Sequence, residues 1–122
     1  MFFPVSGWFA AFVVTLLVEV PIAAWLLRRA EPDLGRRLAI VVFANLVTHP
    51  IVWYVLSQVF LIGTVEYTLA AEAWAVVGEA VFYVVVIRGI RPERSAIVAI
   101  AANVASFAVG RVVGIVSPDL FR

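Results

Sequence analysis

Apolar residues fill four long blocks of the chain, and short polar connections separate the blocks. The blocks cover roughly residues 7–27, 38–60, 67–88 and 96–116, and each can cross a hydrocarbon core of about 30 Å at about 1.5 Å rise per residue. Inside each block the apolar residues are continuous and are not confined to one stripe of a helix. The pattern therefore predicts an all-α polytopic membrane protein with four transmembrane helices.

Composition narrows the class of protein further. Of the 122 residues, 65% are hydrophobic and 14% are charged, so almost nothing remains for a soluble domain. We expect residues 1–122 to form a single transmembrane domain whose main partner is the lipid bilayer. The absence of cysteine excludes disulfides, thiolate metal sites and a cysteine nucleophile. A net charge of +1 gives no indication of nucleic-acid binding.

Arginine is distributed unevenly between the connections. The first connection holds four arginines and the third holds three, namely Arg28, Arg29, Arg36 and Arg37, then Arg88, Arg91 and Arg94. The second connection has no basic residue, so the positive-inside rule places residues 28–37 and 88–95 in the cytoplasm and both termini outside. All nine basic residues are arginines, which is typical of a GC-rich prokaryotic genome. We therefore expect a multi-pass protein of the prokaryotic cytoplasmic (inner) membrane.

The two halves of the chain share a pattern of polar residues, which predicts an internal duplication. Aligning Glu19 with Glu79 also pairs Arg28 with Arg88 and Pro32 with Pro92. After a two-residue difference in the loop, four more pairs follow: Arg36 with Arg94, Ala44 with Ala102, Asn45 with Asn103 and Thr48 with Ser106. The repeats cover about residues 7–60 and 67–116. Because both repeats begin outside, we expect two parallel helical hairpins related by a pseudo-two-fold axis along the membrane normal.

Helical geometry places the repeated polar residues in one layer of the membrane. Counted from the cytoplasmic ends, the two glutamates lie about 12 Å deep and the two asparagines about 10 Å deep. Each asparagine is followed at i+3 by a hydroxyl on the same face, and in the first hairpin a histidine lies one turn further out. We predict that this layer is a cation- or proton-binding site made of Glu19, Glu79, Asn45, Asn103, His49, Thr48 and Ser106.

The chemistry of this layer leaves three outcomes open. Two carboxylates in a low-dielectric layer cannot both stay ionised without compensation, so they would share a proton, bind a cation, or remain neutral and hydrogen-bonded. Carboxylate, amide and hydroxyl oxygens suit a hard divalent cation such as Ca²⁺, Mg²⁺ or Mn²⁺. If His49 also binds, the preference moves toward Mn²⁺, Fe²⁺ or Zn²⁺. A divalent cation held by Glu19, Glu79 and His49 is therefore one hypothesis.

Two further charged residues lie near the outer ends of the last two blocks. Glu72 and Arg111 are each about five residues from the end of their helix, and we expect them to form a structural ion pair, because pairing lets a membrane tolerate both charges. In the first hairpin Phe12 and Trp53 occupy the equivalent positions. Aromatic residues such as Trp53 near the block ends are expected to anchor the helices at the interface.

The most specific run in the sequence is Asn45-Leu46-Val47-Thr48-His49-Pro50, which is followed by Trp53. Glu-Val-Pro stands at 19–21 and Glu-Ala-x-x-Tyr at 79–83. With these residues the chain resembles a group of small, functionally uncharacterised prokaryotic four-helix membrane proteins. The resemblance covers nearly the whole chain and implies the four-helix architecture and the inner-membrane location. It implies no activity.

Three hypotheses for function follow from the polar layer. The first is a transporter or channel subunit that binds a cation or protons, and because four helices leave little room for a pathway, we expect a homo-oligomer. The second is a structural or accessory membrane protein whose neutral, hydrogen-bonded core fixes the register of the helices. The third is a metal-dependent intramembrane enzyme in which Glu79 and His49 activate water. The chain has no H-E-x-x-H motif and no second histidine, so an enzyme is the least favoured hypothesis.

Overall fold

The computed structural model describes residues 5–62 and 64–121, and most of these residues are helical. The long helices are α1 (Val5–Leu26), α2 (Leu34–Tyr54), α4 (Val65–Val86) and α5 (Pro92–Val116). A single turn, α3 (Leu56–Val59), follows α2, and the 3₁₀ helix η1 (Pro118–Phe121) follows α5. The prediction of an all-α chain is confirmed. Four segments are long and apolar enough to cross a membrane, which indicates a multi-pass membrane protein.

Local sequence signals explain where the helices begin. The Asp33 side chain caps α2 by accepting a hydrogen bond from the backbone N–H of Arg36 at 3.1 Å. The Thr64 hydroxyl caps α4 in the same way, with a 3.2 Å bond from the backbone N–H of Tyr67. α5 begins with Pro92, whose missing N–H costs nothing at the first position of a helix.

The second apolar block is one span by length, but its helix is interrupted near its end. Pro50 lies inside α2 and cannot donate a hydrogen bond to the carbonyl of Leu46. The helix continues for one more turn, ends at Tyr54, and restarts as α3 after Val55. The continuous block of residues 38–60 is therefore a helix followed by a separate turn.

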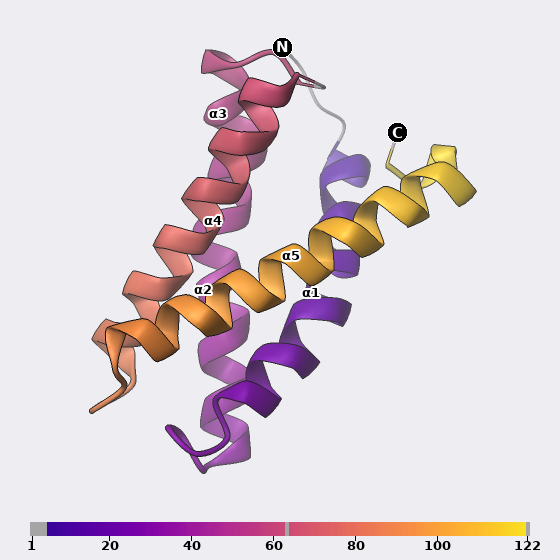
Figure 1. Cartoon of the computed structure of the whole chain (residues 1–122). Helices are drawn as coiled ribbons and strands as arrows, with labels where there is room; N and C mark the ends of the chain where they lie inside the picture. Colours follow the sequence, from indigo (N-terminus) through magenta and orange to yellow (C-terminus); the bar gives the residue numbers. More distant parts are fainter. Residues whose placement is uncertain (1–4, 63, 122) are drawn as a thin grey trace.

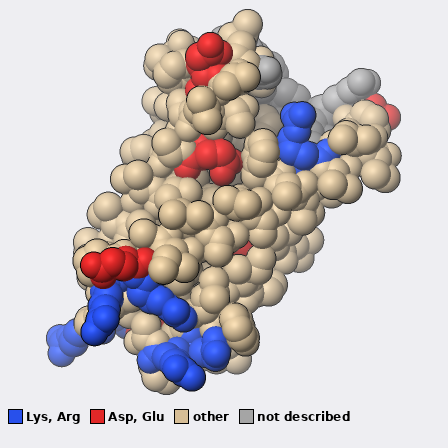
Figure 2. Space-filling view, viewed as in Figure 1, with Lys and Arg blue, Asp and Glu red and all other residues tan. Residues whose placement is uncertain are grey.

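The four long helices form a ring of neighbours. α1 packs against α2 and α5, and α4 packs against the same two helices, so α1 and α4 occupy one diagonal and α2 and α5 the other. The α1–α2 and α4–α5 loops lie at one end of the bundle, whereas α3 and η1 lie at the opposite end (Figure 1). Basic side chains gather at the loop end (Figure 2), which is named the arginine end below. From that end α4 and α5 diverge toward the opposite end (Figure 1).

The apolar core lies in the half of the bundle next to the arginine end. Its buried members are mostly small or branched residues: Ala23, Leu27, Ile40, Val41, Ala44, Tyr83, Ile87, Val98 and Ala102. Small residues let the helix backbones approach closely. Large apolar side chains such as Leu17, Val85 and Ile115 are exposed on the outside, as expected for a surface that faces lipid.

Candidate functional site

The structure brings the repeated polar residues together immediately beyond the apolar core. Ser106 is half-buried, and the other five are buried: Glu19, Asn45, Thr48, Glu79 and Asn103. They come from all four long helices. This cluster is named the polar layer.

Glu79 is held by donors from two helices. Its Oε2 accepts a 2.6 Å hydrogen bond from Nδ2 of Asn103, and its Oε1 lies 3.4 Å from the Thr48 hydroxyl. Asn103 uses the same amide nitrogen to donate to the Ala99 carbonyl at 2.8 Å, so its two protons both have acceptors. The Thr48 hydroxyl is also 3.2 Å from the Ala44 carbonyl. Since a hydroxyl carries one proton, Thr48 can donate it either to the Ala44 carbonyl or to Oε1 of Glu79.

Glu19 is held less completely. Its Oε1 accepts a 2.6 Å hydrogen bond from the Ser106 hydroxyl, whereas its Oε2 has no hydrogen-bond partner among residues 5–62 and 64–121. The side chains of Asn45 and Glu79 lie next to the Glu19 carboxyl group. Two carboxyl groups are thus neighbours in an apolar environment, although α1 and α4 lie on opposite corners of the helix ring.

The contacts in the polar layer run crosswise between the two hairpins. Thr48 of the first hairpin reaches Glu79 of the second, and Ser106 of the second reaches Glu19 of the first. These two contacts correspond to each other when the halves are aligned. Asn103, in contrast, bonds to the glutamate of its own hairpin. Neither hairpin can therefore complete the layer by itself.

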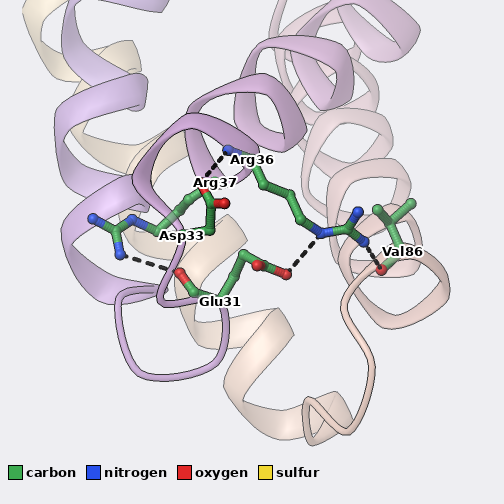
Figure 3. A network of polar contacts seen from close by, with 5 residues as sticks. All are labelled: Glu31, Asp33, Arg36, Arg37 and Val86. Atoms are coloured by element: carbon green, nitrogen blue, oxygen red, sulfur yellow. Dashed lines mark hydrogen bonds and ion pairs between the residues drawn. The ribbon is translucent and has the colours of Figure 1, made fainter.

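The arginine end has a second crosswise set of contacts. Arg36 donates from Nη2 to the Val86 carbonyl at 3.3 Å, and its Nε forms an ion pair with Glu31 at 3.0 Å (Figure 3). The corresponding Arg94 donates from Nη2 to the Leu26 carbonyl at 2.9 Å. Both acceptors lie in the last turn of a helix, where carbonyls lack helical partners and carry partial negative charge. Each arginine therefore caps a helix of the other hairpin.

A cavity of about 270 Å³ lies between the four helices on the other side of the polar layer. Glu19, Asn103 and Ser106 line it, whereas Glu79 is not among its lining residues. Farther from the arginine end, the cavity walls include Glu72 and Arg111. Of the two glutamates in the layer, Glu19 is therefore the one that the cavity reaches.

The set of residues predicted to hold a metal ion is not assembled. Within the described parts of the chain, no group of three or more histidine, aspartate and glutamate side chains is placed to bind a metal. His49 lines the cavity, but its ring packs beside Phe12 and Trp53, with ring centroids 5.1 Å and 6.4 Å away. The imidazole therefore lies on the cavity wall against two aromatic rings.

The predicted ion pair between Glu72 and Arg111 is not formed either. Both residues line the cavity, one from α4 and the other from α5. Across the ranges that the structure describes, the one ion pair is that between Arg36 and Glu31. The physical reason is the divergence of α4 and α5 away from their connecting loop (Figure 1).

Three residues of α4 contribute to the site in ways that the sequence did not indicate. Trp74 donates from Nε1 to the Thr48 carbonyl at 3.1 Å, and Tyr67 donates from its hydroxyl to the Val52 carbonyl at 2.9 Å. Gly78 lets α4 approach α2, since a Cβ there would lie 2.8 Å from Cγ2 of Thr48. The available signal was spacing, because Trp74 and Gly78 are four residues apart and therefore share one face of α4.

Comparisons with known proteins give no match: no family model, no curated protein and no solved structure corresponds to this chain. The geometry of the polar layer and the cavity is therefore the basis for assigning a function.

Proposed function

We propose that the chain is a small membrane transport protein in which the Glu19–Glu79 pair binds a proton or a cation that arrives through the cavity. The observation that carries this proposal is the position of Glu19. Its carboxyl group is buried beside a second carboxyl group, it borders the cavity, and one of its oxygens has no partner within the described residues. Adjacent carboxyl groups in an apolar environment need a proton or a cation between them.

The two glutamates have different roles in this proposal. Glu79 is the inner member, because Asn103 and Thr48 hold both of its oxygens. Glu19 is the member that exchanges its proton or cation with the cavity. The hydroxyls of Thr48 and Ser106 tie each glutamate to the opposite hairpin, so a change in the charge of the pair alters contacts between the hairpins. That connection is what a carrier needs in order to link binding to movement.

Access to the pair differs between the two ends of the bundle. The cavity leads to Glu19 from one side, whereas the apolar core and the Arg36 and Arg94 contacts close the arginine end. With the arginine end in the cytoplasm, as the positive-inside rule predicts, the cavity faces outward. A carrier of this kind works by alternating access, so the arginine contacts would open in the other state.

The wider organisation is part of the same proposal. An internal duplication is supported by the two sets of crosswise contacts, because the alignment exchanges the two contacts within each set. In the polar layer it pairs Glu19 with Glu79 and Thr48 with Ser106, and at the arginine end it pairs Arg36 with Arg94 and Leu26 with Val86. A homo-oligomer in a prokaryotic inner membrane stays the expected setting, since four helices provide few walls for a pathway.

A structural or accessory protein is the second candidate, and a specific observation favours it. Most polar atoms of the polar layer already have partners, and their hydrogen bonds connect helices that are distant in sequence. Such a network can serve only to fix the register of the helices. The metal-dependent enzyme of the third hypothesis gains no support from the described residues, because its ligand set is not assembled.

Ion flux into proteoliposomes separates the two candidates. Purified protein is reconstituted, and proton flux and the flux of Na⁺, K⁺, Mg²⁺ and Mn²⁺ are measured for wild type, Glu19→Gln and Glu79→Gln. Transport predicts that each substitution abolishes flux of one of these ions while the melting temperature stays close to that of wild type. Glu66→Gln is the matched control, because Glu66 is exposed in the first turn of α4 and should keep full flux.

The opposite result would favour the structural candidate. In that case no form of the protein conducts any of these ions, and both glutamine variants melt at a lower temperature than wild type and Glu66→Gln.

A further inference from the structure

We infer that the cavity is a binding site for a small zwitterion, a molecule with an ammonium group and a carboxylate or phosphate group, which Glu72 and Arg111 recognise. The inference rests on the proposed transport function, because the zwitterion would be the substrate whose movement the Glu19–Glu79 pair drives. It assigns a task to two charged residues that the polar layer does not use.

The charges of the cavity wall are complementary to such a ligand. Glu72 and Arg111 line one cavity from different helices, yet in the described ranges neither makes an ion pair or a side-chain hydrogen bond. Charged groups within membrane-spanning helices are costly unless a partner compensates them. A guanidinium group offers a planar fork of donors that matches carboxylate and phosphate, and a carboxylate accepts hydrogen bonds from an ammonium group. One zwitterion satisfies both side chains, whereas an ion of a single sign satisfies one.

The size and the walls of the cavity limit the ligand. A volume of about 270 Å³ holds about nine water molecules, so the ligand has at most about ten non-hydrogen atoms. This volume is slightly below the usual range for drug-sized ligands, which begins at about 300 Å³. Aromatic walls from Trp53, Tyr67 and Phe107 suit a short hydrocarbon chain between the two charged groups. A compact amino acid or an aminoalkyl phosphate fits these limits.

The position of Glu72 connects the ligand to the polar layer. Glu72 and Glu19 both line the cavity, so a cation bound at Glu72 shares the same enclosed space as the Glu19 carboxyl group. An ammonium group bound at Glu72 would therefore also stabilise the ionised form of Glu19 and favour release of its proton. Binding of the zwitterion and binding of a proton at Glu19 thus oppose each other, which is the behaviour of an exchanger.

Equilibrium binding to purified protein in detergent tests the inference, with isothermal titration calorimetry as the measurement. The zwitterionic probes are glycine, β-alanine, γ-aminobutyrate and phosphoethanolamine. Each amino acid is compared with an alkylammonium ion and a carboxylate of the same chain length. We expect at least one zwitterion to bind wild-type protein about tenfold or more tightly than both single-charge analogues, since each lost charge-assisted contact costs about that much.

The variants give a readout that loss of folding would not mimic. In Arg111→Gln the zwitterion should bind no better than its alkylammonium analogue, and in Glu72→Gln no better than its carboxylate analogue. Arg88→Gln and Glu66→Gln, which change charge outside the cavity, should keep the wild-type preference. If no zwitterion binds, or if the preference survives in Arg111→Gln and Glu72→Gln, the inference is overturned.

Two further measurements identify the source of the ligand and separate this inference from the proposed function. The first measures binding of free phosphoethanolamine to the protein in nanodiscs of phosphatidylethanolamine and in nanodiscs of phosphatidylglycerol. Weaker binding in phosphatidylethanolamine would identify a lipid headgroup as the ligand. Equal binding in both lipids would identify a soluble ligand. Binding of a zwitterion with no ion flux in proteoliposomes would retain the site and reject transport. Ion flux that depends on Glu19, without binding of any zwitterion, would retain transport and reject the zwitterion site.

Discussion

Next to the arginine end the four helices pack through alanines and branched residues, whereas in the other half they enclose a cavity of about 270 Å³. The repeated residues build the closed half and its boundary, including both crosswise sets of contacts. Beyond the polar layer, several residues that line the cavity differ between the repeats: Glu72 aligns with Phe12, Arg111 with Trp53, and His49 with Phe107. A symmetric framework therefore supports an asymmetric cavity, and the groups that could select a ligand are those in which the two hairpins differ.

The largest effect on stability is expected from a substitution in the polar layer, which lies between the closed half and the cavity. Asn103→Leu takes away the 2.6 Å donor of Glu79 and leaves a buried acceptor unsatisfied, which should lower the free energy of unfolding by about 2–3 kcal/mol. Unfolding in mixed detergent micelles measures the change. Val104→Leu is the control, because Val104 is exposed on the same helix and should show no loss. A loss below about 0.5 kcal/mol would mean that Glu79 does not depend on this amide.

A smaller effect is expected from forcing α4 and α2 apart. Gly78→Ala places a Cβ 2.8 Å from Cγ2 of Thr48, so the helices must separate slightly, at a cost of about 1–3 kcal/mol. The substitution should also weaken ion flux, because Thr48 moves away from Glu79. Gly110→Ala is a matched control for the melting temperature, since no described atom lies within 4 Å of the Cβ that it adds. Equal melting temperatures for the two variants would show that α2 and α4 are not in close contact at Gly78.

The smallest effect is expected at the arginine end. Arg36→Gln and Arg94→Gln each remove a cap on a helix of the other hairpin, worth about 0.3–1 kcal/mol. Amide hydrogen exchange should become faster in the last turns of α4 and α1, respectively, and stay unchanged around the cavity. Arg29→Gln, at an exposed position of the first loop, serves as the control. Faster exchange around the cavity would show that the two halves of the bundle do not open independently.

The four long helices, and the meeting of the repeated polar residues at one level of the bundle, could be predicted from the sequence because both follow from counting residues along a helix. Glu19 and Glu79 meet, as do Asn103 and Glu79, since equal depth and a shared helix face leave few alternatives. The crosswise contacts could not be predicted, because they depend on how far α4 approaches α2, and Gly78 sets that distance. The expected pairing of Glu72 with Arg111 failed for a related reason, since a sequence does not show that two helices joined by a short loop diverge.

The crosswise hydrogen bonds also have a consequence for biosynthesis. When α1 and α2 have been synthesised, Glu19 is present, but Ser106, the donor for Glu19, has not yet been made. The first hairpin must therefore hold an incompletely bonded carboxyl group until α5 emerges. The last of the four long helices to be synthesised therefore completes the hydrogen bonding of the first.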